Sequence, residues 1–212
     1  MTGFAPLRFI PPCNPIRATE PPVGEAWLHE PKLDGYRLQI VKSGPTVRLY
    51  SRNGHEWTAR LATVTDALQG LACRSAVIDA ELCFLTGTGA PNFAGLQLAL
   101  RSRQHHKLTV FAFDFLHRNG IDLRPLPLYQ RKLRLLRLIA RSDIPCLHLV
   151  ETFDDGAKLL DSAERMLLEG IVSKRRNSVY RSGECRDWVK IKTESWRAAN
   201  RERWRLFERG RM

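Results

Sequence analysis

The sequence of 212 residues has no apolar stretch near the roughly 18 residues that a membrane-spanning helix needs, so we expect no membrane partner. Its five cysteines are odd in number and include no Cys-x-x-Cys pair, which argues against a disulfide framework and a zinc site. The first ten residues lack a charged start followed by an apolar run, so we expect no secretory signal. These absences favour a reducing compartment, and we predict a cytoplasmic protein.

Acidic residues are few relative to basic ones. Lys and Arg number 34 and Asp and Glu 22, which gives a formal charge of +12. A basic excess of this kind favours a polyanionic partner such as nucleic acid, although charge alone does not establish one. The apolar fraction of 43% is enough to bury a core and excludes a disordered chain.

Proline is scarce outside the first 22 residues, which hold six of the twelve prolines. Because proline fixes φ and removes a backbone donor, residues 1–22 are predicted to form an extended arm across the surface.

Apolar and polar residues alternate over 36–40 and 47–50, on either side of a Ser-Gly-Pro turn, and this pattern predicts a hairpin. Strands that follow one another as hairpins favour an α+β fold, with antiparallel or mixed sheets flanked by helices, over a Rossmann sheet.

The spacing of apolar residues predicts the remaining elements. The expected helices cover residues 61–68, 93–101, 129–141, 154–168 and 195–209, and further strands cover 76–85, 108–115, 171–174 and 188–192. In the helix over 129–141, Leu133, Leu136 and Ile139 share one side. That helix also carries basic side chains that face either DNA phosphates or solvent, at positions 131, 132, 134, 137 and 141.

Candidate chemical groups begin at the segment EPKLDGYR, residues 30–37. Lys32 precedes an Asp-Gly turn, and Arg37 follows on the next strand, so an amine and a guanidinium surround one point. A Lys-x-Asp-Gly pattern also occurs by chance in surface turns. On a later strand, the period of two places Asp79 and Glu81 on one face.

Four further segments follow in order: SRNG at 51–54, FAFDFL at 111–116, EGIVSK at 169–174 and DWVKIK at 187–192. The ordered series resembles the covalent nucleotidyltransferases, namely ATP-dependent DNA ligases, RNA ligases and mRNA-capping enzymes. It is similar to the ligase module of bacterial end-joining DNA ligases over residues 27–193. The resemblance implies a covalent nucleotidyltransferase (ATP-grasp-like) fold. One departure is Ala80, where the family usually has glycine between two acids, and we expect this small residue to be tolerated.

The resemblance implies a role for each matching residue. Lys32 attacks the α-phosphate of ATP and becomes a lysine–AMP phosphoramidate, while Lys190 and Lys192 grip that phosphate. The other implied positions are Glu30 near adenine, Phe113 stacked on it, Arg37 and Arg52 at the ribose and phosphates of ATP or of the nicked strand, and Glu81 and Glu169 as ligands of Mg²⁺ or Mn²⁺. Glu81 is favoured over Asp79, which is interpreted as structural.

Plainer interpretations stand beside these roles. Phe113 also fits a core position, because Phe111 and Phe115 share its face in a regular strand. Lys190 and Lys192 also fit an exposed strand face.

The nucleophile must be a neutral amine, and at pH 7 only about one free lysine in 10³ is neutral. Nearby cations shift that balance toward the neutral amine and also neutralise phosphate charge during attack.

The leading hypothesis is a minimal ATP-dependent DNA ligase that acts on nicked or broken double-stranded DNA. We expect residues 23–193 to form the adenylation domain and 194–212 a basic tail, with too few residues after Thr193 for an OB-fold domain. Ku or an OB domain supplied in trans is an expected partner, and the bacterial nucleoid the expected place. The alternatives are a partner-dependent or non-catalytic DNA-end binding module, and an RNA ligase or guanylyltransferase. The lack of a cysteine-spaced zinc module argues against an NAD-dependent ligase.

Overall fold

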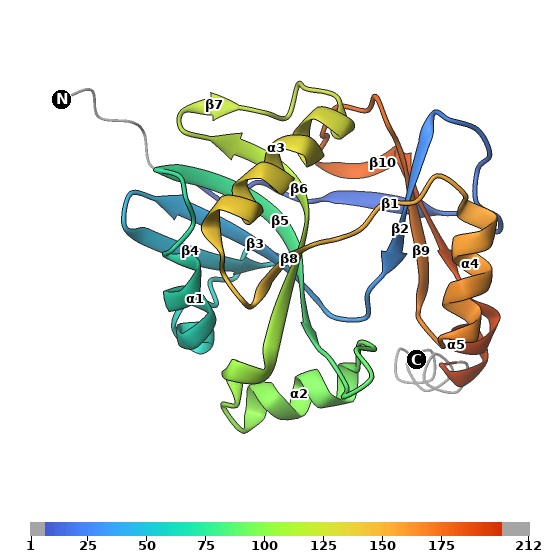
Figure 1. The fold of residues 1–212 in the computed structure, drawn as a ribbon, viewed down its shortest axis with the longest axis horizontal. Coiled ribbons are helices and arrows are strands. Elements are labelled where there is room, and N and C mark those ends of the chain that lie inside the picture. Colours follow the sequence, from blue (N-terminus) through green and yellow to red (C-terminus); the bar gives the residue numbers. More distant parts are fainter. Residues whose placement is uncertain (1–6, 201–212) are drawn as a thin grey trace, which may run out of the picture.

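The protein forms two β-sheets with helices on their outer sides (Figure 1). The computed structural model describes residues 7–200. The four-stranded sheet has the order β1 (Cys13–Arg17), β10 (Gly183–Lys192), β9 (Gly170–Arg175), β2 (Trp27–Lys32). The larger sheet has the order β4 (Thr46–Ser51), β3 (Tyr36–Ser43), β5 (Ser75–Phe84), β6 (Leu108–Arg118), β7 (Ile121–Asp122), with β8 (Leu147–Leu149) also paired to β6. Each sheet mixes parallel and antiparallel pairs, so the α+β prediction is confirmed.

Helices cover the sheets at the ends and outer faces. The structure contains η1 (Ala59–Leu61), α1 (Ala62–Leu68), α2 (Phe93–Arg101), η2 (His105–Lys107), α3 (Leu128–Ser142), α4 (Gly156–Arg165) and α5 (Glu194–Ala199). Side chains cap two of these helices: Asn92 accepts from the backbone N–H of Gly95, and Asp155 from that of Lys158. In Figure 1, α4 and α5 flank the smaller sheet at the right, and α3 crosses the larger sheet. Among residues 7–200, no helix is both long and apolar enough to cross a membrane.

Three clusters of buried side chains hold these layers together. The largest lies between the larger sheet and α1, α2 and α3. A second cluster joins the two sheets, and it includes Leu28 and Trp188 from the smaller sheet with Val41 and Val77 from the larger one. A third packs α4 on the smaller sheet. The second cluster therefore fixes how the two sheets sit against each other.

The N-terminal proline-rich segment contributes a strand. Residues 13–17 form β1, an edge strand that pairs in parallel with β10, and Cys13 is fully buried. At the other end, α5 covers Glu194–Ala199, and positions 201–209 of the helix expected over 195–209 lie outside the described residues.

The prediction that Leu133 and Leu136 belong to the apolar side of α3 is wrong. Leu133 and Leu136 are 45% and 48% exposed, whereas Leu135 and Leu138 are buried. Arg131 and Lys132 are buried on the same side, because their charges pair with carboxylates beneath the helix, so they face neither DNA nor solvent.

The predicted common face of three phenylalanines on β6 is also wrong. The register between β5 and β6 shifts between Asp79 and Ala80, which places one extra residue on β6. Phe115 therefore joins the largest core cluster, while Phe113 packs on the cluster between the sheets. Phe113 keeps the face opposite to Ala112, beside the second cluster and the pocket described below, whereas the bulge turns Phe115 to the other face.

Candidate active site

A pocket of about 490 Å³ opens where the two sheets meet. Its lining comes from both sheets and includes most of the predicted site residues: Glu30, Lys32, Arg37, Arg52, Glu81, Phe113 and Lys190. Of the other two predicted residues, Glu169 forms an ion pair with Lys32, and Lys192 forms an ion pair with the same Glu169 carboxylate. The structure thus gathers all nine predicted positions around one pocket.

Strand register places the nucleophile candidate Lys32 beside its partners. Lys32 at the end of β2 and Lys192 at the end of β10 both pair with Gly170, the first residue of the strand between them. Glu169 directly precedes Gly170 and lies between the two lysines. Its Oε2 is 2.8 Å from Lys32 Nζ, and its Oε1 is 3.1 Å from Lys192 Nζ.

Glycine is required at position 170, where β9 lies between β10 and β2. Its φ is +148°, and a Cβ on it would lie 2.0 Å from the carbonyl oxygen of Ile191. Any side chain would push β10 away from β9 and with it Lys192 away from Glu169.

Glu30 forms a buried charge cluster at one side of the pocket. Lys132 of α3 binds its Oε1 at 2.6 Å, and Lys174 of β9 binds its Oε2 at 2.5 Å. The Lys174 ammonium also lies 4.5 Å from the ring centre of Phe113 and 4.1 Å from that of Trp188. Burial lowers the pKa of Lys174, and the Glu30 carboxylate opposes this shift.

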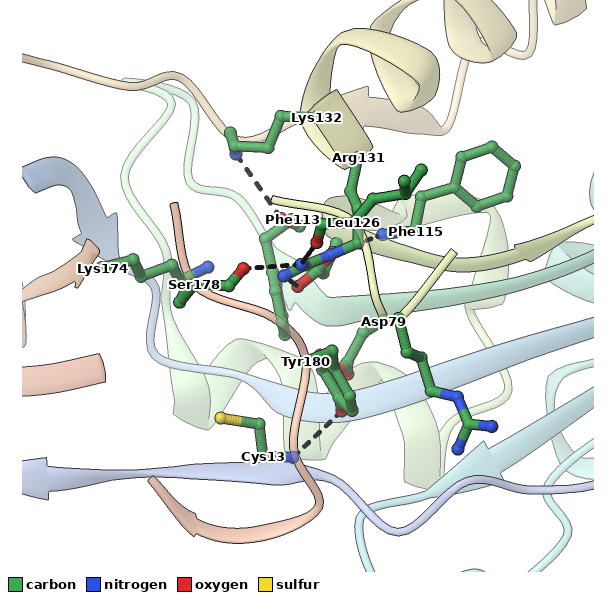
Figure 2. Close-up of polar contacts among 12 residues, drawn as sticks. Cys13, Asp79, Phe113, Phe115, Leu126, Arg131, Lys132, Lys174, Ser178 and Tyr180 are labelled. Atoms are coloured by element: carbon green, nitrogen blue, oxygen red, sulfur yellow. Dashed lines mark hydrogen bonds and ion pairs between the residues drawn. The ribbon is translucent and has the colours of Figure 1, made fainter. Parts of the chain in front are cut away.

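Arg37 is held by a network that reaches the N-terminal strand. Asp79 accepts from Nε of Arg37 at 2.9 Å and from Nη2 at 2.5 Å, and Arg37 Nη1 donates to the carbonyl of Cys13. Tyr180 donates to Asp79 at 2.8 Å and accepts from the Cys13 backbone N–H at 3.0 Å, a contact drawn in Figure 2. Asp79 therefore orients Arg37, and β1 is part of that arrangement.

A second buried pair supports this region from α3. Arg131 donates to both oxygens of Asp114, at 2.7 and 2.8 Å, and neither side chain is exposed. Figure 2 shows the same guanidinium beside Leu126 and Ser178, whose carbonyl groups accept from Nη1. The pair joins α3 to β6 just beyond Phe113.

Basic side chains gather at one side of the pocket. Arg52 donates to the side chain of Asn14 at 2.8 Å, and Arg17 of β1 lies opposite Lys190 in the strand register. Burial, followed by the charges of Lys32 and Arg52, lowers the pKa of Lys190. This concentration of positive charge suits a phosphate chain.

Glu81 and Glu169 are the carboxylates available for a metal ion. Burial raises the pKa of Glu81 to about 7, while Lys32 and Arg37 act against this rise and Glu169 adds to it. Residues 7–200 hold no group of three or more His, Cys, Asp or Glu side chains arranged for a metal. Two carboxylates nevertheless fit Mg²⁺, which takes oxygen ligands and keeps several waters or substrate phosphates.

Several site residues have no signal of their own in the sequence. Lys132 reaches the site from a helix outside the motifs, and Tyr180 lies shortly before the last motif without an assigned role. Trp196 follows that motif as the first aromatic residue of the tail. Lys174 stands inside the segment EGIVSK, and its burial against Glu30 becomes evident only in the structure.

Comparisons with known proteins identify the family of the chain. The sequence profile described as "ATP dependent DNA ligase domain" matches residues 12–192. This chain belongs to the ATP-dependent DNA ligase family. The predicted resemblance to ligases and the predicted nucleotidyltransferase fold are therefore confirmed.

Two of the similar proteins are named for non-homologous end joining. The chain is 40% identical over 176 residues to the multifunctional non-homologous end joining protein LigD of Pseudomonas aeruginosa, which covers 82% of this chain and 21% of the relative. It is 33% identical over 187 residues to LigD of Mycobacterium tuberculosis, with 87% and 24% covered. The chain thus spans about a fifth to a quarter of these relatives.

Solved structures give the same result. A mycobacterial DNA ligase D complexed with ATP and MES matches with a TM-score of 0.71 and 30% identity, over 85% of this chain and 59% of that one. An adenylated Chlorella virus DNA ligase, at 18% identity and a TM-score of 0.60 over 85% of this chain and 66% of that one, shares the fold.

Proposed function

We propose that this chain takes AMP from ATP onto Lys32 and passes it to the 5′-phosphate of a DNA nick, which is then sealed. The observation that carries the proposal is the position of Lys32. Lys32 lines a pocket large enough for a nucleotide, and its amine forms an ion pair with Glu169.

In the first step, Lys32 Nζ attacks the α-phosphorus of ATP. The N–P bond forms, the bond from that phosphorus to the bridging oxygen breaks, and pyrophosphate leaves. The amine proton has an acceptor in Glu169 Oε2, 2.8 Å away. Lys190 and Lys192 stabilise the negative charge that develops on the α-phosphate, since fixed cations at the reacting phosphate lower the barrier.

The side of the pocket around Glu30 is proposed to receive the base. Phe113 offers a ring for stacking, and Glu30 offers carboxylate oxygens to the amino group of adenine. Lys132 and Lys174 hold that carboxylate in place. Guanine presents a carbonyl at the corresponding position, so this arrangement favours ATP over GTP.

Mg²⁺ or Mn²⁺ would be held by Glu81 and Glu169. When bound, such an ion polarises the phosphate and offsets its charge. The remaining work of binding and orientation belongs to the side chains already described. Arg37 and Arg52 are proposed to bind the ribose and the phosphates of ATP or of the nicked strand.

The DNA partner is proposed from charge and from the relatives. The chain carries a formal charge of +12, and Arg52 and Lys190 of the pocket lining lie near Arg17. The relatives named for non-homologous end joining support broken DNA as the target. The proposed division of the chain is an arm (1–22), an adenylation domain (23–193) and a basic tail (194–212). The proposed partner is Ku or an OB domain supplied in trans, and the proposed place of action is the cytoplasm.

The test is intact mass spectrometry of protein incubated with ATP and Mg²⁺, alongside Lys32→Ala. We expect an added AMP on the wild-type chain and none on the variant. A wild-type chain without adduct, or an adduct that survives in Lys32→Ala, would overturn the proposal. GTP in place of ATP, and RNA nicks in place of DNA nicks, distinguish the related transferases.

A DNA-end binding module is the second candidate, and the charge of +12 favours it. It predicts DNA binding that weakens steeply with salt, without any need for ATP. Sealing of a pre-adenylated DNA nick separates the two, because only a ligase closes it.

A further inference from the structure

Helix α5 is fixed to the elements that carry Glu169. Thr193, just before the helix, donates its hydroxyl to the carbonyl of Leu168 at 2.7 Å. The Glu164 carboxylate at the end of α4 accepts from the backbone N–H groups of Glu194 and Ser195, at 2.7 and 2.9 Å. The first turn of α5 therefore has a defined place next to the start of β9.

This placement brings the ring of Trp196 against the active site. Lys192 Nζ lies 3.5 Å from the ring centre, well inside the roughly 6 Å limit of a cation–π contact. The same Nζ is 3.1 Å from Glu169, whose other oxygen binds Lys32. Burial raises the pKa of the nearby Asp34 carboxyl, and the Trp196 indole acts against this rise. Trp196 thus contacts Lys192 and lies near Asp34, and both residues flank the Lys32–Glu169 pair.

We propose that Trp196 is a positioning residue for adenylation, which keeps the Lys192 ammonium in place to meet the α-phosphate. This inference rests on the proposed function. A lysine side chain is long and flexible, so its ammonium can keep an ion pair with a carboxylate in more than one side-chain conformation. The carboxylate that binds Lys192 is also shared with Lys32. The aromatic face supplies a second contact, so less side-chain freedom is lost when the phosphate arrives.

A packing role for Trp196 makes different predictions. Packing depends on apolar volume, which leucine partly fills, whereas positioning depends on the aromatic face, which phenylalanine keeps and leucine lacks. The matched control is Trp27→Leu, because the Trp27 ring also faces a cation, Arg175 at 4.7 Å, and does not line the pocket. Rates are counted per folded molecule.

The experiment is single-turnover formation of the lysine–AMP adduct, followed by intact mass at several ATP concentrations. For Trp196→Leu we expect the maximal rate to fall roughly tenfold, as for loss of a partly desolvated cation–π contact, while the ATP concentration for half-maximal rate is unchanged. Trp196→Phe is expected to retain most of the rate, and Trp27→Leu all of it. In a Lys192→Ala background, Trp196→Leu is expected to cause no further loss, because Trp196 acts through that lysine.

Three results would overturn the inference: Trp196→Leu equal to wild type, Trp196→Phe as slow as Trp196→Leu, or a full additional loss in the Lys192→Ala background. NMR of the lysine ε-methylene groups adds a readout that does not need turnover. Ring current shifts the Lys192 signal upfield in wild type, and Trp196→Leu abolishes the shift; an unshifted wild-type signal also overturns the inference. A wild-type chain that forms no adduct overturns the proposed function and this inference together, whereas adduct formation unaffected by Trp196→Leu overturns the inference alone.

Discussion

Lys132 and Glu30 are 102 positions apart in the sequence, and the lysine donates to the carboxylate at 2.6 Å. Lys132 belongs to α3, which packs on the larger sheet, whereas Glu30 belongs to β2 of the smaller sheet. Both side chains are buried. The contact therefore joins the two halves of the fold at the wall of the pocket.

Replacing Lys132 with methionine keeps most of the side-chain volume and removes the charge. Glu30 then has one buried cationic partner in place of two, and we expect a loss of roughly 3 kcal/mol in the free energy of unfolding. Denaturation in urea measures the loss, with Arg137→Met on the exposed side of α3 as the matched control. Equal midpoints for the two variants would show that the pair does not stabilise the fold.

Replacing Tyr180 with phenylalanine removes one hydroxyl that joins Asp79 to the backbone of Cys13. Two buried groups lose a partner, so we expect a cost of about 2 kcal/mol and faster amide exchange in β1. Hydrogen exchange followed by mass spectrometry measures the second effect. Tyr129→Phe is the control, because Tyr129 is exposed and its hydroxyl accepts from the Gln130 side chain. Unchanged exchange at Cys13 in Tyr180→Phe would contradict the role of the hydroxyl.

Local patterns predicted much of the fold. The structure begins and ends α2 at Phe93 and Arg101, as the apolar spacing predicts, and Asn92 caps its start. The strand expected over 188–192 lies within β10, and its neighbours Trp188 and Val189 pack in different clusters on opposite sides of that strand. Such elements depend on residues within one or two turns, or on one strand, and these are visible in the sequence.

Other features depend on partners distant in the sequence and were not predictable. Arg131 and Lys132 are buried because Asp114 and Glu30 lie beneath them, which no periodicity of α3 reveals. The bulge that separates Phe113 from Phe115 arises from pairing with β5. In the site, the roles of the motif residues were expected from the resemblance, whereas the contacts of Tyr180 with Asp79 and Cys13 become evident only in the packed structure.

Replacing Gly170 with alanine should separate β9 from β10. The added Cβ would lie 2.0 Å from the Ile191 carbonyl, so the Glu169–Lys192 contact is expected to be lost together with several kcal/mol of stability. Gly183→Ala is the control, because a Cβ at Gly183 meets nothing within 4 Å and only its φ of +87° is strained. Thermal melting of both variants checks this, and a Gly170→Ala variant at least as stable as Gly183→Ala would contradict the argument.

Glu81 should make the stability of the protein depend on pH. Burial raises the pKa of Glu81 to about 7 in the folded protein, above its ordinary value of 4.5. Between these pH values the unfolded chain releases a proton that the folded protein keeps, so wild type loses stability as pH rises, and the loss is complete above pH 7. Glu81→Gln has no such proton, so its stability relative to wild type should increase by up to roughly 3 kcal/mol from pH 4.5 to 7.5. Urea unfolding with EDTA and without nucleotide measures this difference, with the exposed Glu184→Gln as control. A difference that stays constant across this range would mean that the Glu81 carboxyl is not desolvated in the folded protein.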